Sequence, residues 1–276
     1  MRAPFGARLT ERVAERGPLC VGIDPHPGLL TDWGLTVDAA GLERFALTCV
    51  EAFAGEVAVV KPQSAFFEAH GSRGVAVLER VLAETAQAGA LTLLDVKRGD
   101  IGTTMAAYAQ AYLAEGSPLA ADAITVSPYL GFGSLDPALD LAGQTGRGIF
   151  VLALTSNPEG ASVQRAVDTT GRTTAQAVVD AAAARNAGSV PLGSVGLVVG
   201  ATVGRSGLDL SALNGPLLAP GFGAQGATAA DLRAVFGDTL PAVLPASSRD
   251  VLRHGPDVAA LRAAALRTGE SVAQLL

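Results

Sequence analysis

Two carboxylates and one ammonium group lie within six residues at the end of an apolar segment, residues 91–94. They belong to Asp95, Lys97 and Asp100. Side chains of an extended strand alternate between its two faces, so Asp95 and Lys97 are predicted to share one face. Opposite charges in a pocket that excludes water keep each other ionised. Schiff-base chemistry needs a neutral amine. A lysine that stays charged is better suited to stabilising a developing carbanion and then protonating it.

A second ammonium group ends an earlier apolar run and completes a candidate set of four charged residues. The set comprises Lys61, Asp95, Lys97 and Asp100. A purely structural ion-pair network is the alternative interpretation. Buried ion pairs stabilise proteins weakly because desolvation offsets their attraction, so four such groups favour a functional role. Taken alone, Asp100 stands where a helix would begin and is expected to cap that helix.

Short apolar runs alternate with alanine-rich helical segments along the chain, which indicates repeated βα units. The predicted strands cover residues 19–24, 57–61, 91–97, 123–127, 149–154, 195–199, 216–219 and 242–246. Eight units predict an α/β fold of the TIM (β/α)8 barrel type, in a single domain over residues 1–276. A doubly wound open sheet is the alternative, because βα repetition alone does not show closure. Residues 156–174 form a long polar connection of the kind that often marks a functional or mobile loop.

Polar residues follow most of the predicted strands, at the ends where a barrel places its reactive groups. They are Asp24, Lys61, Asp95, Lys97, Ser156, Gln225 and Arg249. So many polar groups would converge only if the strand ends form a ring. Their positions therefore favour the barrel over the open sheet.

The glycine-rich segment 221–226 matches G-x-G-x-x-G, but only one predicted strand follows it. A dinucleotide fingerprint would instead open a βαβ unit, with an acidic residue about 20 residues later. Backbone amides ahead of a helix that starts near Thr228 are expected to bind an anion, which Arg249 would also contact. Loops seven and eight form the usual phosphate site of barrels. A flexible turn and a solvated surface arginine are the alternatives.

The composition excludes several classes of protein. The 276 residues are 49% hydrophobic and carry a formal net charge of −6. An acidic chain without clustered Lys and Arg argues against nucleic acid as a partner. No apolar run approaches the roughly 18 residues of a membrane span, and residues 1–17 lack a secretory core, so a cytoplasmic protein without a membrane partner is expected. The two cysteines and three histidines match no metal-ligand spacing, so no metal site is predicted.

Five ordered motifs resemble the orotidine 5′-phosphate decarboxylase family, specifically its bacterial second type. They are GIDPHP at 22–27, VVKPQSAFFE at 59–68, LLDVKRGDIGTT at 93–104, ALTSNPEG at 153–160 and APGFGAQG at 219–226. The resemblance covers nearly the whole chain. It implies a barrel, a homodimer with shared active sites, and no cofactor or metal. The implied reaction converts orotidine monophosphate to uridine monophosphate and CO2 in pyrimidine biosynthesis.

The resemblance also implies a role for each charged residue. Lys61, Asp95, Lys97 and Asp100 match the alternating Lys-Asp-Lys-Asp network of the family, in which Lys97 protonates C6 of the pyrimidine. One part of the set would act in the active site of the other subunit. That part is Asp100. The resemblance implies that Ile101 and Thr104 also line the partner's pocket.

The remaining site residues would bind the substrate. By resemblance, Asp24 contacts the ribose hydroxyls and Ser156 reads the amide edge of the pyrimidine. Gln225 and Arg249 would hold the phosphate. These residues follow four different predicted strands.

Two other functions remain open. The D-x-K-x-x-D pattern also resembles sugar-phosphate decarboxylases and hexulose-phosphate synthases, which use magnesium. Those relatives keep an acidic residue where Lys61 stands, so Lys61 argues against them. A noncatalytic binder of nucleotide phosphates is the third interpretation, and the intact charged network argues against it.

Overall fold

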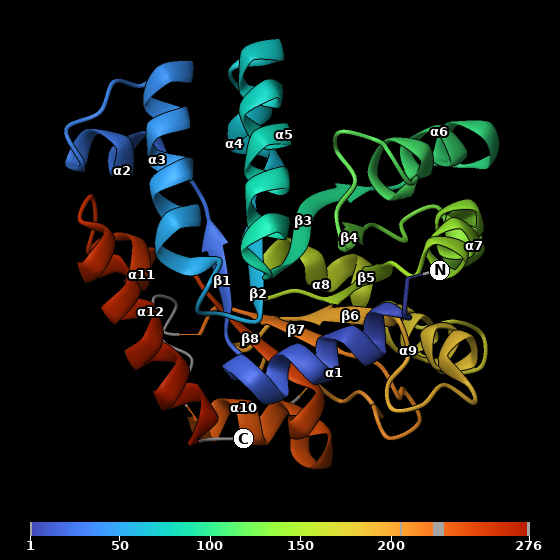
Figure 1. Cartoon of the computed structure of the whole chain (residues 1–276). Helices are drawn as coiled ribbons and strands as arrows, with labels where there is room; N and C mark the ends of the chain where they lie inside the picture. Colours follow the sequence, from blue (N-terminus) through green and yellow to red (C-terminus); the bar gives the residue numbers. More distant parts are fainter. Residues whose placement is uncertain (1, 205, 223–228, 275–276) are drawn as a thin grey trace.

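The computed structural model describes residues 2–204, 206–222 and 229–274. Eight parallel strands close into a barrel that is surrounded by helices (Figure 1). The strands are β1 (Cys20–Ile23), β2 (Val59–Pro62), β3 (Leu91–Arg98), β4 (Ala123–Val126), β5 (Gly148–Leu154), β6 (Val195–Val199), β7 (Leu217–Pro220) and β8 (Val243–Ser247).

The α-helices are α1 (Phe5–Arg16), α2 (Pro27–Asp32), α3 (Ala39–Phe53), α4 (Ser64–Glu68), α5 (Gly71–Ala88), α6 (Gly102–Leu113), α7 (Asp136–Thr145), α8 (Ala161–Gln164), α9 (Thr174–Asn186), α10 (Ala229–Phe236), α11 (Arg249–Leu252) and α12 (Val258–Ala273). Short 3-10 helices occur at η1 (Phe132–Leu135), η2 (Pro158–Gly160) and η3 (Gly237–Ala242). No helix within the described ranges combines the length and the apolar character needed to cross a membrane.

The barrel closes between its first and last strands. β1 runs parallel to β8, with Cys20 opposite Ala246 and Val21 opposite Ser247. The open-sheet alternative is therefore wrong, and the predicted (β/α)8 barrel is confirmed. Each predicted strand has an observed counterpart whose ends differ by at most two residues. The strands were predictable because parallel strands buried on both faces form continuous apolar runs.

The interior of the barrel is a packed apolar core, and helix α1 closes its amino-terminal end. Phe5 and Leu9 of α1 are buried among the inward-facing side chains of the strands. The ring of Phe5 meets that of Phe150 edge to face, with the centroids 5.9 Å apart, a favourable aromatic geometry. A side chain at Gly148 would collide with the Phe5 ring. Because this end is filled, a site is expected at the opposite end, where the strands finish.

A second apolar core lies between the strands and the surrounding helices. Helix α3 shows how the sequence places such a helix. Asp38 precedes it, and its carboxylate accepts hydrogen bonds from the backbone amides of Ala40 and Gly41, at 3.0 and 2.9 Å. These bonds satisfy amides that the start of a helix leaves without partners. Phe45 and Phe53 on the same helix are fully buried in the core.

The long connection between β5 and α9 lies where the sequence predicts it, but it contains more structure than a plain loop. Two short helices, η2 and α8, occupy its first half. Val167 and Thr173 then form an isolated antiparallel bridge. Between them, the Asp168 carboxylate accepts a hydrogen bond of 2.8 Å from the amide of Thr170. Asp168 therefore stabilises a turn, which explains part of the polar composition of this segment.

Candidate active site

Two adjoining cavities open at the carboxyl ends of the strands. One, of about 270 Å³, is lined by Lys61, Asp95 and Lys97. The other, of about 350 Å³, is lined by Asp24, Lys61 and Arg249. Lys61 borders both, so residues from β2, β3 and the segments that follow β1 and β8 surround one region. The structure thus brings together residues that lie far apart in the sequence, as the ring of strand ends predicts.

Asp95 lies between two ammonium groups at the centre of this region. Its Oδ1 accepts a hydrogen bond of 2.6 Å from Lys97 Nζ, and its Oδ2 accepts one of 3.3 Å from Lys61 Nζ. Lys61 and Asp95 are only 7% and 8% exposed, whereas the side chain of Lys97 is 45% exposed. The prediction that Asp95 and Lys97 share a face of β3 is confirmed. The buried carboxylate of Asp95 thus holds the ammonium of Lys97 at the cavity.

These contacts determine the charge of each group. Burial would raise the pKa of the Asp95 carboxyl, but the charges of Lys61 and Lys97 and the hydrogen bonds from Lys97 and Thr125 outweigh it and lower the pKa to about 2. Burial would lower the pKa of Lys61, but the charges of Asp24 and Asp95 outweigh it and raise that pKa. Asp95 and Lys61 are therefore both ionised at neutral pH, as opposite charges in a pocket are expected to be.

A local irregularity in β3 places Lys97 at its position. The pairing register with β4 shifts between Leu94 and Arg98, and Lys97 has a positive φ of 46°. This left-handed conformation is uncommon for a residue with a side chain and needs support from its surroundings. Thr125 of β4 supplies part of that support, because its Oγ1 accepts a hydrogen bond of 2.9 Å from the backbone amide of Lys97.

Thr125 is a site residue that the sequence analysis missed. Its hydroxyl also donates a hydrogen bond of 2.7 Å to Asp95 Oδ1, and the residue is buried. It thus holds the Asp95 carboxylate and the Lys97 backbone at once. A sequence signal did exist, since Thr125 is the only polar residue of β4, between Ile124 and Val126. A lone hydroxyl in an apolar strand requires a buried partner.

We expect Thr125→Val to destabilise the protein by about 1.5–3 kcal/mol at pH 7, the usual contribution of a hydrogen bond to a charged group. Valine keeps the shape of threonine but cannot donate to Asp95 or accept from Lys97. Urea unfolding followed by circular dichroism measures the loss. Thr125→Ser is the matched control, because it retains the hydroxyl. A Thr125→Val protein as stable as the Ser variant would contradict this role.

The destabilisation by Thr125→Val should also depend on pH. The folded-state pKa of Asp95, about 2, lies below the unfolded-state value of about 3.9. The contribution of the ionised carboxylate is therefore complete above pH of about 4 and is lost as the pH falls toward about 2. The difference in unfolding free energy between the wild type and the Val variant should narrow across that range.

Asp24 offers an acceptor to the cavity. Its Oδ1 lies 3.8 Å from Lys61 Nζ, which is an ion pair but too long for a hydrogen bond. Among the described residues, that buried oxygen has no hydrogen-bond partner, although buried polar atoms almost always have one. The Asp24 side chain as a whole is 18% exposed and borders the cavity.

Ser156 and Arg249 lie in the lining of different cavities. Ser156 follows β5 and borders the cavity that contains Lys97. Arg249 begins helix α11 after β8 and borders the cavity that contains Asp24. In the described part of the chain, the guanidinium of Arg249 has no carboxylate within 4.0 Å. Gln225 and most of the glycine-rich segment lie outside the described residues.

The structure does not bring Asp100 into the charged cluster of its own chain. Its carboxylate accepts a hydrogen bond of 2.8 Å from the adjacent amide of Ile101, and it forms no ion pair with any described residue. The expectation that Asp100 caps a helix is wrong. Helix α6 begins at Gly102, and Ile101 occupies the capping position without a side-chain bond. Ile101 is 61% exposed, and Thr104 is also exposed.

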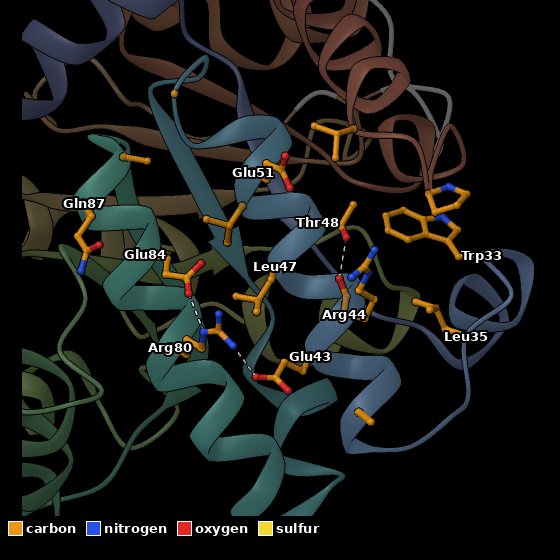
Figure 2. Close-up of a pocket in the computed structure, with 16 residues that line it drawn as sticks. Trp33, Leu35, Glu43, Arg44, Leu47, Thr48, Glu51, Arg80, Glu84 and Gln87 are labelled. Atoms are coloured by element: carbon orange, nitrogen blue, oxygen red, sulfur yellow. Dashed lines mark hydrogen bonds and ion pairs between the residues drawn. The ribbon is translucent and has the colours of Figure 1, made fainter.

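A larger groove, of about 1250 Å³, lies away from this cluster, beside the outer surface of α3 (Figure 2). Arg80 of α5 bridges two carboxylates there, that of Glu43 at 2.8 Å and that of Glu84 at 2.6 Å. None of the residues that the sequence predicts for the site lines this groove. The volume of a groove alone therefore does not identify the site. The buried charged residues and the strained backbone of Lys97 lie at the mouth of the barrel instead.

Comparison with known proteins agrees with this geometry. The model of the family described as "Orotidine 5′-phosphate decarboxylase / HUMPS family" matches residues 17–264. An orotidine 5′-phosphate decarboxylase of Salinispora arenicola is 70% identical over 263 residues, which are 95% of each chain. A crystal structure of a protein from Streptomyces avermitilis is 62% identical, with a TM-score of 0.97 over 99% of this chain and 96% of that one.

A more distant solved structure supports the same assignment. The orotidine monophosphate decarboxylase of Leishmania donovani is 31% identical, with a TM-score of 0.76 over 99% of this chain and 98% of that one. The family match covers Asp24, Lys61, Asp95 and Lys97, and it extends past Arg249. The chain therefore belongs to the orotidine 5′-phosphate decarboxylase / HUMPS family.

Proposed function

We propose that this chain, acting as a single domain, converts orotidine 5′-monophosphate to uridine 5′-monophosphate and CO2 in pyrimidine biosynthesis, without a cofactor or metal. The observation that carries the proposal is the Asp95 carboxylate held between Lys61 and Lys97 at the mouth of the barrel. This arrangement keeps the Lys97 ammonium fixed beside a cavity. A fixed cation is what a reaction through an unstabilised carbanion needs.

In the proposed reaction, the bond between C6 of the pyrimidine and its carboxylate breaks, and the electron pair stays on C6 as CO2 leaves. The ammonium of Lys97 stabilises this negative charge as it develops. Lys97 then transfers a proton to C6, and its neutral amine regains a proton from solvent. Asp95 keeps Lys97 in place, and its own charge repels the substrate carboxylate in the ground state.

The proposed substrate contacts use the rest of the lining. The carboxylate of Asp24, which borders the cavity, accepts from a ribose hydroxyl, and Ser156 reads the amide edge of the pyrimidine. Arg249, with Gln225 beyond the described residues, holds the phosphate. Binding the distant phosphate would provide energy for orienting the reacting group.

We also propose a homodimer in which each active site takes Asp100, Ile101 and Thr104 from the partner. Exposed apolar residues support an interface beside this segment. Ile101 is 61% exposed, and Tyr129, in the connection after the neighbouring strand β4, is 78% exposed. The end of β3 and the connection after β4 are joined by a hydrogen bond of 2.8 Å from the amide of Ser127 to the carbonyl of Arg98. Neighbouring exposed apolar groups are typical of protein interfaces.

The test of the function is turnover of orotidine monophosphate, followed by its absorbance change and by identification of uridine monophosphate as the product. Activity should survive incubation with EDTA. Loss of activity in EDTA and its return with magnesium would contradict a metal-free reaction. Tight binding of uridine monophosphate without decarboxylation would favour a noncatalytic binder.

We expect Arg249→Met to lower kcat/KM for orotidine monophosphate by about 10- to 100-fold, because an ionic hydrogen bond contributes about 1.5–3 kcal/mol. Steady-state kinetics measure this loss. The nucleoside orotidine, which lacks the phosphate, is the matched control substrate. Its slow decarboxylation should be the same for the wild type and for Arg249→Met. An equal loss with both substrates would mean that Arg249 does not contact the phosphate.

A further inference from the structure

Arg98 follows Lys97 in the sequence but points to the opposite side of β3, away from the cavity. Its guanidinium donates to Glu68 Oε1 at 2.6 Å and to the Tyr112 hydroxyl at 3.3 Å. It also lies over the ring of Tyr108, 5.6 Å from the centroid. Arg98 therefore joins helix α4, strand β3 and helix α6, in contacts that the proposed reaction does not use.

Glu68 connects this contact to the other lysine of the site. It is the last residue of α4, the short helix that begins two residues after β2 and its Lys61. Ser64, at the start of α4, donates a hydrogen bond of 2.5 Å to the same Oε1 atom. The Glu68–Arg98 ion pair thus links the segment after Lys61 to the strand end that carries Lys97.

Arg98 also supports the irregular backbone at Lys97. Neither Val96 nor Lys97 appears in the pairing register of β3 with its neighbours. Thr125 accepts from the amide of Lys97 on the inner side, and Arg98 Nη1 donates to the carbonyl of Val96 at 3.2 Å. Two side chains therefore hold the C=O and the N–H of one peptide group, the one between Val96 and Lys97 that precedes the left-handed residue. Backbone groups released from a ladder need such partners.

We propose that Glu68 and Arg98 are positioning residues that hold the Lys97 ammonium at the distance catalysis requires. The inference rests on the proposed function, since it assigns the pair a role in that reaction. The planar guanidinium of an arginine can donate hydrogen bonds to Glu68 and to the Val96 carbonyl at the same time, whereas the ammonium of a lysine is a single point charge. Neither residue lines the two cavities at the carboxyl ends of the strands.

The test is a double-mutant cycle with Arg98→Lys, Glu68→Gln and the double variant. Each single variant should lower kcat about tenfold and change KM less than twofold, because the proposed phosphate and ribose contacts come from other strand ends. The double variant should be no slower than the slower single variant, as expected for residues that act as a unit. Unchanged kcat in the folded single variants, or multiplicative losses in the double variant, would overturn the proposal.

The matched control is the ion pair between Arg80 and Glu84 on α5, which also has a length of 2.6 Å but lies in the groove of Figure 2. Arg80→Lys and Glu84→Gln should leave kcat unchanged. If kcat fell equally in these variants, the loss of kcat in the Arg98 and Glu68 variants would not depend on their position beside Lys97. The proposal would then fail.

A structural readout separates this proposal from the proposed function. In a crystal structure of Arg98→Met, we expect Nζ of Lys97 to move away from Asp95. An unchanged Lys97–Asp95 contact would overturn the positioning role, whatever the activity. A wild-type protein without turnover would defeat the proposed function, while this crystal structure would still decide whether Arg98 holds Lys97.

Discussion

Lys97→Ala should lower kcat/KM for orotidine monophosphate by at least about 100- to 1000-fold, while the barrel remains folded. Loss of one fixed electrostatic stabiliser costs about 2.7–4 kcal/mol of transition-state stabilisation, and Lys97 would also supply the proton. The fold should survive because the side chain is 45% exposed, so its truncation leaves no closed cavity. Asp95 would keep its hydrogen bonds from Lys61 and Thr125.

Single-turnover and steady-state kinetics measure this effect, and circular dichroism with urea unfolding verifies the fold. Arg80→Ala is a suitable control, because it removes a half-exposed cation outside the proposed site. Its kinetics should equal those of the wild type. Near-normal turnover by Lys97→Ala would remove this residue from the mechanism and leave the cation at the barrel mouth without a catalytic role.

Mixing two inactive variants, Lys97→Ala and Asp100→Ala, should restore activity if the active sites are shared across a dimer. In a heterodimer, one site would contain both substitutions and the other would contain neither. Equal mixing with free exchange makes about half of the dimers heterodimers, so about a quarter of wild-type activity should return. The structure motivates this test because Asp100 forms no ion pair with the described residues of its own chain, although it is three residues from Lys97.

Differently tagged subunits would verify exchange in the same experiment. The matched control mixes Lys97→Ala with Asp95→Asn. Both side chains belong to one cluster within a single chain, so every site of that heterodimer carries one defect and no activity should return. If exchange is verified but Lys97→Ala and Asp100→Ala recover nothing, Asp100 does not act in the site of a partner.

Local sequence patterns predicted the strands and part of the site. The eight strands were evident because each is a short apolar run, and buried parallel strands have that composition. The pairing of Asp95 with Lys97 followed from the two-residue repeat of one strand. Their meeting with Lys61 followed from a general property of barrels, whose strand ends converge. These predictions required no knowledge of side-chain contacts.

Other features depended on neighbours that local patterns do not specify. The helix cap expected at Asp100 was wrong because β3 continues to Arg98 and the backbone turns before α6 begins. Thr125 was missed because its importance arises from its position beside Asp95 on the adjacent strand. The ion pair of Arg98 with Glu68 was missed because it joins side chains 30 residues apart.

By itself, the sequence of this chain determined a parallel barrel with charged groups at the carboxyl ends of its strands, since both follow from periodicity and strand order. Only the tertiary structure decided the register shift at Lys97, its left-handed backbone and the side chains that support it. The physical reason is that hydrogen bonds and ion pairs act over about 3 Å. They depend on atomic positions that arise only when the whole chain has packed.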